Sequence, residues 1–135
     1  MSEAIFDFLS VNLSVGDRIS PLSIPQQTEV PAMAFRRISD SPVITHDSAQ
    51  THPLYDGSRY VVSRYQFDCY DVTIGGAEAL ADELVLLTAG YKGLWGDVEI
   101  DRVDPDVRVD DWDEKPGLYR VVQDLLIGHR VAVSS

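Results

Sequence analysis

Two segments of the chain carry a clear hydrophobic period. Residues 58–72 alternate as a half-buried strand does, with mainly apolar side chains on one face and a mixed set on the other. Residues 76–89 place alanine and leucine at three- and four-residue steps, which predicts an amphipathic helix that ends at Gly90. We therefore expect this strand to pack one face on a helix and to leave the other face partly wet.

Weaker patterns predict the remaining elements. Residues 3–13 form a short amphipathic helix with Ser2 as its N-cap. Further strands are expected at residues 18–24 (a short edge strand interrupted by prolines), 32–39, 97–103 and 118–133, the last with a bend near Gly128. This order lacks the strict alternation of a parallel α/β sheet. It predicts an α+β fold in a single domain, residues 1–135, with a mostly antiparallel sheet and two helices on one face.

Two long polar segments separate these elements. Residues 40–57 have no apolar period and contain two prolines, so we expect a long inter-strand loop. The segment from Asp104 to residue 116 begins with Asp104-Pro105-Asp106, which is turn chemistry, and we expect a second, acidic loop there. Loops of this length in a compact domain are usually functional or disordered.

Charge is the compositional feature that changes this picture. The chain has 135 residues, of which 44% are hydrophobic, and its net charge is −11. Residues 97–114 hold nine acidic and two basic side chains, which is more than half of that net charge. Nucleic-acid binders neutralise phosphates with Lys and Arg, so a general affinity for nucleic acid is excluded. The bland alternative for the acidic segment is a solvated stretch that aids solubility.

The sequence also bounds the compartment. Its one cysteine, Cys69, cannot form an internal disulfide. The N-terminus lacks the basic start and apolar block of a secretion signal, and no aliphatic run is long enough to span a membrane. We expect a soluble protein that works, or is assembled, inside a cell and does not engage a membrane.

The sequence fits no known catalytic or metal-binding pattern. His46, Asp47, His52 and Asp56 share one loop and could ligate zinc, but their spacing matches no metal-binding helix. The acidic run after residue 100 departs from the EF-hand pattern, because Arg108 takes a ligand position.

The candidate nucleophiles do not fit either. Cys69 is expected to be a small core side chain, and His129 has no obvious Ser or Asp partner in the sequence. No GxSxG, P-loop or GxGxxG motif is present. We expect no catalytic site, no cofactor and no metal.

What remains favours an interaction protein. Two long polar loops and two aromatics expected to face solvent, Tyr70 and Trp112, could reach a neighbouring subunit. Two alternatives stay open at this point. One is an acidic DNA-mimic inhibitor of a nucleic-acid-binding protein, and the other is a small hydrolase that uses His46 and His52.

Several segments, taken in order, resemble the siphophage tail-completion proteins, also called tail terminators or head-tail connectors. They are the opening helix at residues 4–9, the strand that follows Pro31 at residues 31–39, the central strand at residues 64–70 with the helix at 77–82, and the closing strand at residues 117–125. The matches cover nearly the whole chain, whereas residues 40–57 and the acidic segment fit only loosely.

The resemblance implies an α+β subunit that assembles into a homo-hexameric ring. Such a ring caps the tail tube protein, ends its polymerisation and presents a surface to the head connector or neck protein, while DNA passes through the lumen without specific binding. It would reside at the head-tail junction of the virion, and in the host cytoplasm during assembly. An adjacent neck-ring (head-completion) protein is an alternative with the same fold.

Six copies would carry a charge of −66, so the ring would repel itself unless arginines pair across its interfaces. We expect some of five arginines to do so: Arg36, Arg37, Arg64, Arg102 and Arg120. The other candidate interaction residues are His46, His52, Asp104, Asp106, Asp110, Asp111, Trp112 and Asp113.

Overall fold

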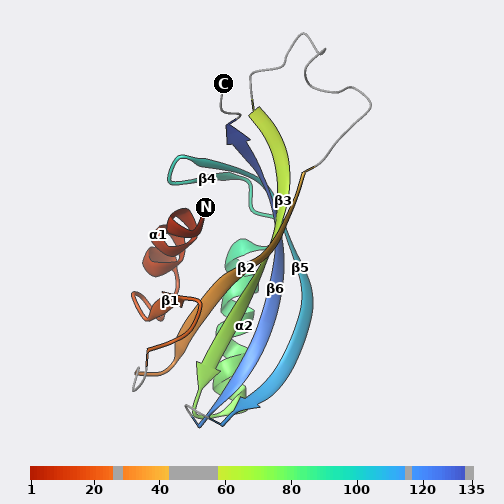
Figure 1. The fold of residues 1–135 in the computed structure, drawn as a ribbon. Coiled ribbons are helices and arrows are strands. Elements are labelled where there is room, and N and C mark those ends of the chain that lie inside the picture. Colours follow the sequence, from red (N-terminus) through yellow and green to blue (C-terminus); the bar gives the residue numbers. More distant parts are fainter. Residues whose placement is uncertain (26–28, 43–57, 115–116, 133–135) are drawn as a thin grey trace.

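The computed structural model describes residues 1–25, 29–42, 58–114 and 117–132 (Figure 1). Its six strands form one sheet in the order β1-β2-β3-β6-β5-β4. The strands are β1 (Ile19–Pro21), β2 (Ala32–Pro42), β3 (Ser58–Asp71), β4 (Gly93–Trp95), β5 (Val98–Asp113) and β6 (Leu118–Ala132). All neighbours are antiparallel except β1 and β2, which are parallel. The α+β prediction is confirmed, with a mixed rather than purely antiparallel sheet.

The β3–β6 pair is the centre of the sheet. The two strands stay in register from Ser58 opposite Ala132 to Asp71 opposite Tyr119. Side chains alternate between the faces of a strand, so this register sorts them into an apolar face and a polar face. The apolar face of the central strands carries Met33, Phe35, Tyr65, Phe67, Cys69, Ile100, Val103, Val121, Leu125 and Ile127, all buried.

Helix α2 (Ile74–Thr88) covers this apolar face. It begins because the Thr73 hydroxyl accepts a hydrogen bond from the backbone N–H of Gly76 at 3.0 Å, which satisfies a donor that the first turn leaves free. The expected stripe is buried at Ala77, Leu80, Ala81, Leu84 and Thr88. The helix starts two residues earlier than the apolar period predicts, because its cap lies outside that period.

Helix α1 (Ser2–Asn12) packs into the same core, so both helices lie on one face, as predicted. Ser2 is not the N-cap, however. Met1 occupies that position without a side-chain cap, and the Ser2 hydroxyl lies 3.5 Å from the phenolic oxygen of Tyr65. The ring of Phe8 stacks on Trp95 of β4, with 4.9 Å between centroids. Helix α1 therefore contacts both strands at the ends of the sheet order, β1 and β4.

The predicted acidic loop at residues 104–116 is wrong as far as the structure describes it. Strand β5 continues through Asp104-Pro105-Asp106 to Asp113, paired with β6. The register shifts between Pro105 and Arg108, and this irregularity accommodates the proline, which cannot donate a ladder hydrogen bond. Local turn propensity is thus overruled by pairing with a strand that comes later in the chain.

The other loop prediction is wrong at its first three residues. Strand β2 does not stop at Ser39 but reaches Pro42, paired with Val61 of β3. The rest of the predicted loop, residues 43–57, lies outside the described residues. Strand β6 runs through Gly128 to Ala132, and the irregularity near Gly128 is a register shift in β5, between Ile100 and Arg102.

The core packing can be tested on two leucines of α2. Leu84 is fully buried, whereas Leu86 is 87% exposed. We expect Leu84→Ala to lower the free energy of unfolding by about 2–5 kcal/mol, because it removes buried methyl groups and leaves a cavity. Leu86→Ala, the matched control, should change it by no more than about 0.5 kcal/mol. Urea unfolding followed by circular dichroism measures both, and equal effects would contradict this packing.

Candidate interaction surface

The face of the sheet opposite the helices carries most of the candidate charged residues. No described helix covers it (Figure 1). By alternation from the core positions, β3 presents Arg64, Gln66, Asp68 and Tyr70 there, and β6 presents Arg120, Val122 and Asp124. Strand β5 adds acidic side chains beside them. We call this the helix-free face.

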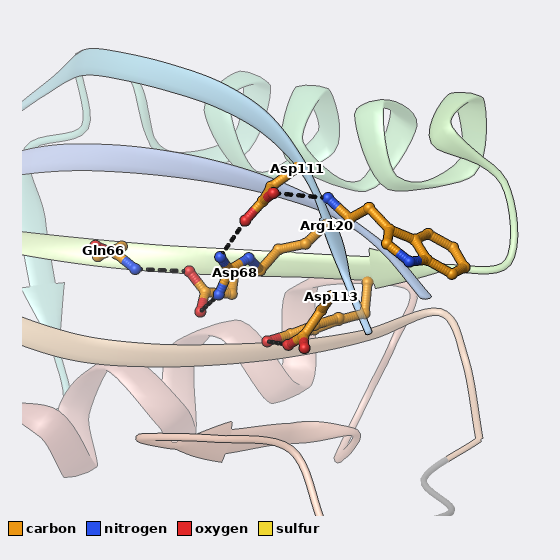
Figure 2. Close-up of polar contacts among 7 residues, drawn as sticks. Gln66, Asp68, Asp111, Asp113 and Arg120 are labelled. Atoms are coloured by element: carbon orange, nitrogen blue, oxygen red, sulfur yellow. Dashed lines mark hydrogen bonds and ion pairs between the residues drawn. The ribbon is translucent and has the colours of Figure 1, made fainter. Parts of the chain in front are cut away.

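Arg120 lies at the centre of one ionic cluster on this face (Figure 2). Its guanidinium is 2.5 Å from the Asp111 carboxylate on one side and 3.6 Å from that of Asp68 on the other. Gln66 holds the second oxygen of Asp68 by donating from its side-chain amide at 2.9 Å. Strand pairing makes this possible, since Arg120 is opposite Tyr70 of β3 and opposite Asp111 of β5.

These contacts shift the titration of both partners. Burial lowers the pKa of the Arg120 guanidinium, but its hydrogen bonds to Asp111 and Tyr70 raise it more, so the net shift is upward. The hydrogen bond from Arg120, with a second from the backbone N–H of Trp112, holds the pKa of Asp111 below its ordinary value. Both groups are therefore charged at neutral pH, and the cluster is a permanent ionic contact.

Arg64 forms a second cluster further along the same face. One of its terminal nitrogens is 2.8 Å from an oxygen of Asp106 and 3.0 Å from one of Asp124. These hydrogen bonds raise the pKa of Arg64. Asp106 belongs to β5 and Asp124 to β6, so this arginine ties the acidic strand to the centre of the sheet.

The structure gives four of the five predicted arginines a carboxylate in their own chain. Besides Arg64 and Arg120, Arg37 pairs with Asp40 at 3.1 Å and Arg102 with Asp104 at 2.7 Å. Arg36 has no ion pair with any described residue. Pairing of these arginines between subunits stays a prediction, and Arg36 is the one whose charge is not matched within the described part of its chain.

The two aromatic side chains predicted to face solvent differ in their burial. Trp112 is 49% exposed and contacts Tyr119 edge-on at 4.9 Å, as expected for an aromatic available to a partner. Tyr70 is buried, which corrects the prediction. It lies among charged neighbours, with its hydroxyl 3.4 Å from the Asp113 carboxylate. The alternating pattern placed it on the polar face and could not show that this part of the face is covered.

The structure also assembles a buried polar chain that the sequence did not reveal. The Ser63 hydroxyl donates to Asp40 at 2.5 Å and lies 2.7 Å from Nε2 of His129. Since its proton is given to Asp40, Ser63 accepts from the Nε2–H of His129. The imidazole therefore donates to Ser63 and does not take its proton, unlike the histidine of a Ser-His catalytic pair. No local motif could have found it, since Ser63 and His129 are 66 residues apart.

Burial dominates the titration of His129. It lowers the pKa of the imidazole below the ordinary value of 6.5, although nearby Asp40 and a backbone hydrogen bond to Arg130 act in the opposite direction. The N-terminal amine also lowers it. His129 is therefore neutral at pH 7, and in the tautomer with its proton on Nε2 it can donate to Ser63.

The remaining candidates are one cysteine and two histidines. Cys69 is buried in the core, as predicted, and burial raises the pKa of its thiol. His46 and His52 lie outside the described residues, so their roles remain predictions. Within the described ranges, no three His, Cys, Asp or Glu side chains gather as a metal site would require. No helix in that part of the chain is both long and apolar enough to cross a bilayer.

The fold is similar to that of a known assembly component. No protein-family model and no curated protein matches the chain. Among solved structures, it is similar to a chain from a virion of a native gene transfer agent (GTA) particle, with a TM-score of 0.58 and 11% sequence identity. The match covers 95% of this chain and 92% of the other. The two chains therefore share a fold along nearly their whole length.

The Arg120 cluster should contribute to stability. Arg120→Leu leaves the largely buried Asp68 carboxylate without its cation. We expect the free energy of unfolding to fall by about 1–3 kcal/mol, the usual cost of an unsatisfied buried polar group. Arg102→Leu is the control, because Arg102 is 72% exposed and its pair with Asp104 should be worth less than about 1 kcal/mol. Chemical denaturation of both variants checks the difference, and a neutral Arg120→Leu would disprove the role.

His129 should make stability depend on pH in one direction. Its folded pKa is below the unfolded value of 6.5, so on acidification the unfolded chain takes up the proton first. The free energy of unfolding should therefore fall as the pH drops below about 6.5, and this contribution should be present in full above it. His129→Gln keeps a donor for Ser63 but does not titrate. Thermal unfolding between pH 7.5 and 5 should show a shallower decline for this variant, and an unchanged decline would rule out His129 as the cause.

Proposed function

We propose that this chain is a structural protein of a phage-type virion and forms a ring at the head-tail junction as a tail terminator. The observation that carries the proposal is the shared fold with a virion chain, which extends over 95% of this chain and 92% of the other. A match to only part of either chain would fit a common supersecondary unit, whereas this match extends over nearly the whole of both chains. In this role the ring caps the tail tube and joins it to the head connector.

The charge distribution suits a ring through which DNA passes. Each copy has a net charge of −11, so a ring of six copies has few Lys and Arg side chains available to bind DNA phosphates and displace their counterions. DNA would then slide through without being held. The ring would reside in the virion and be assembled in the host cytoplasm, with the tail tube protein and the neck protein as its partners.

The DNA-mimic alternative is weakened by where the arginines lie. A mimic needs carboxylates spaced along a face with their charge available to a basic partner. On the helix-free face, Asp106 and Asp111 are instead paired with Arg64 and Arg120 of their own chain. The face presents alternating charges, which is the pattern of a protein–protein contact surface rather than of a phosphate backbone.

Loss of the protein from the virus or particle that encodes it should test the role directly. We expect tails of uncontrolled length that are not joined to heads, because nothing ends polymerisation of the tube. Electron micrographs of lysates show both defects, and adding back the purified chain should correct them. The surface variant Leu86→Ala should restore assembly as well as the unaltered protein does.

The same micrographs separate the competing roles. Tails of normal length that fail to attach would indicate a neck-ring protein instead. Particles that assemble normally without the chain would exclude both virion roles.

A further inference from the structure

The central sheet has two open edges that lie at opposite ends. Strand β1 pairs with β2 only from Met33 to Phe35, so no described strand covers residues 36–42. On the other side, β4 pairs with β5 only from Val98 to Ile100, and Gly90 donates to the carbonyl of Val103. Residues 104–113 of β5 therefore form the second open edge among the described strands. We call these segments the β2 edge and the β5 edge.

Unpaired strand edges invite pairing with another chain, and proteins usually protect them. Strands β1 and β4 both contact α1, so they lie toward the helix layer and leave the centre of the sheet bounded by β2 and β5 (Figure 1). The described residues of the β2 edge from Arg36 to Ser41 are all exposed, as are those of the β5 edge from Pro105 to Trp112. Both edges are therefore accessible along their length.

The two edges are complementary in charge. The β2 edge holds two arginines and one aspartate, whereas the β5 edge holds five aspartates and one arginine. Two β5 edges would repel each other, and so would two β2 edges, but a β2 edge and a β5 edge attract. Arg36 and Asp110 have no ion-pair partner among the described residues, so each adds an unmatched charge to its own edge. Exposed apolar side chains lie on both edges: Ile38 (47%), Val107 (53%), Val109 (52%) and Trp112 (49%).

We infer that the β2 edge of one copy docks antiparallel on the β5 edge of the next; this inference rests on the proposed ring. The directions agree, because β5 runs antiparallel to β2 within the sheet. Such a contact joins two different surfaces head to tail, which is the kind of interface that closes into rings. Each edge is therefore paired with an edge of another copy of this chain.

The geometry of the sheet sets the tilt of the strands relative to the ring axis. Ser39, at the middle of the β2 edge, is level with Asp104 across the sheet, whereas the middle of the β5 edge lies near Val109. Docking the two requires a shift of about four residues, or about 13 Å, between neighbouring copies. Over four strand spacings, about 19 Å in all, this inclines the strands by about 35° to the ring axis. Strands in closed sheets are tilted by a similar amount, about 35–45°.

Cross-linking tests the contact. The variant Ser39→Cys with Val109→Cys places one exposed thiol on each edge, and the native Cys69 is buried and does not compete. With a short bismaleimide, rings of this variant should give a ladder of covalent multimers on a denaturing gel. Each single variant should give none, because a head-to-tail contact brings unlike edges together. Ser39→Cys with Leu86→Cys is the control, since Leu86 lies on α2 and away from both edges.

Charge reversal gives an independent readout. Arg36→Glu makes the β2 edge net negative, like the β5 edge, and should reduce ring formation at least tenfold, as judged by sedimentation or electron microscopy. Lys92→Glu is the matched control, because it makes the same change in net charge at an exposed residue between α2 and β4, away from both edges, and it should leave ring formation unchanged. Equal effects of the two variants would contradict the edge contact.

The outcomes separate the edge contact from the proposed function. Rings without a ladder from the double-cysteine variant, or a ladder from either single variant, would overturn the edge pairing and leave the ring role intact. A protein that forms no ring even in the presence of tail tubes would overturn both. A ladder together with a loss of rings in Arg36→Glu, but not in Lys92→Glu, would establish the contact.

Discussion

The antiparallel register between β3 and β6 is the constraint on which the rest of the structure depends. It sends the apolar side chains of both strands to one face, where α1 and α2 cover them, and the charged ones to the other. The same register sets Arg64 near Asp124, while the register between β5 and β6 brings Arg120 opposite Asp111. A slip of one residue between β3 and β6 would bury the arginines and expose the core. The alignment of these two strands therefore separates the core from the ionic surface.

The sequence predicted the elements whose burial is one-sided. Strand β3 and helix α2 alternate between core and solvent, so their periods of two and 3.6 are visible in the chain. The second half of β5 is exposed on both faces and contains Asp104-Pro105-Asp106. Nothing local distinguishes it from a loop, because its strand conformation comes from pairing with β6. Burial on one face is visible in the sequence as a period of apolar residues, whereas the pairing of a strand that is exposed on both faces is not.

The candidate surface was predictable in kind but not in arrangement. Arginines and aspartates were expected to matter for assembly, and the structure gathers many of them on one face, but which carboxylate each arginine meets depends on strand order. The burial of Tyr70 and the chain from Asp40 through Ser63 to His129 depend on it too. These contacts join residues far apart in the sequence, and a single sequence carries no information about such distances.

The distance along the chain between β3 and β6 also has a consequence for the order of events after synthesis. Ser63 and His129, which face each other across this pair, are 66 residues apart, so a large loop must close before the sheet gains its central contacts. Topologies dominated by such distant pairings fold more slowly than helical ones. Strands β5 and β6 are consecutive in the chain, so their pairing needs no such loop closure. The closing of β3 on β6 is therefore the costly step, because it joins the hairpin of β5 and β6 to the part of the sheet that holds β2 and β3.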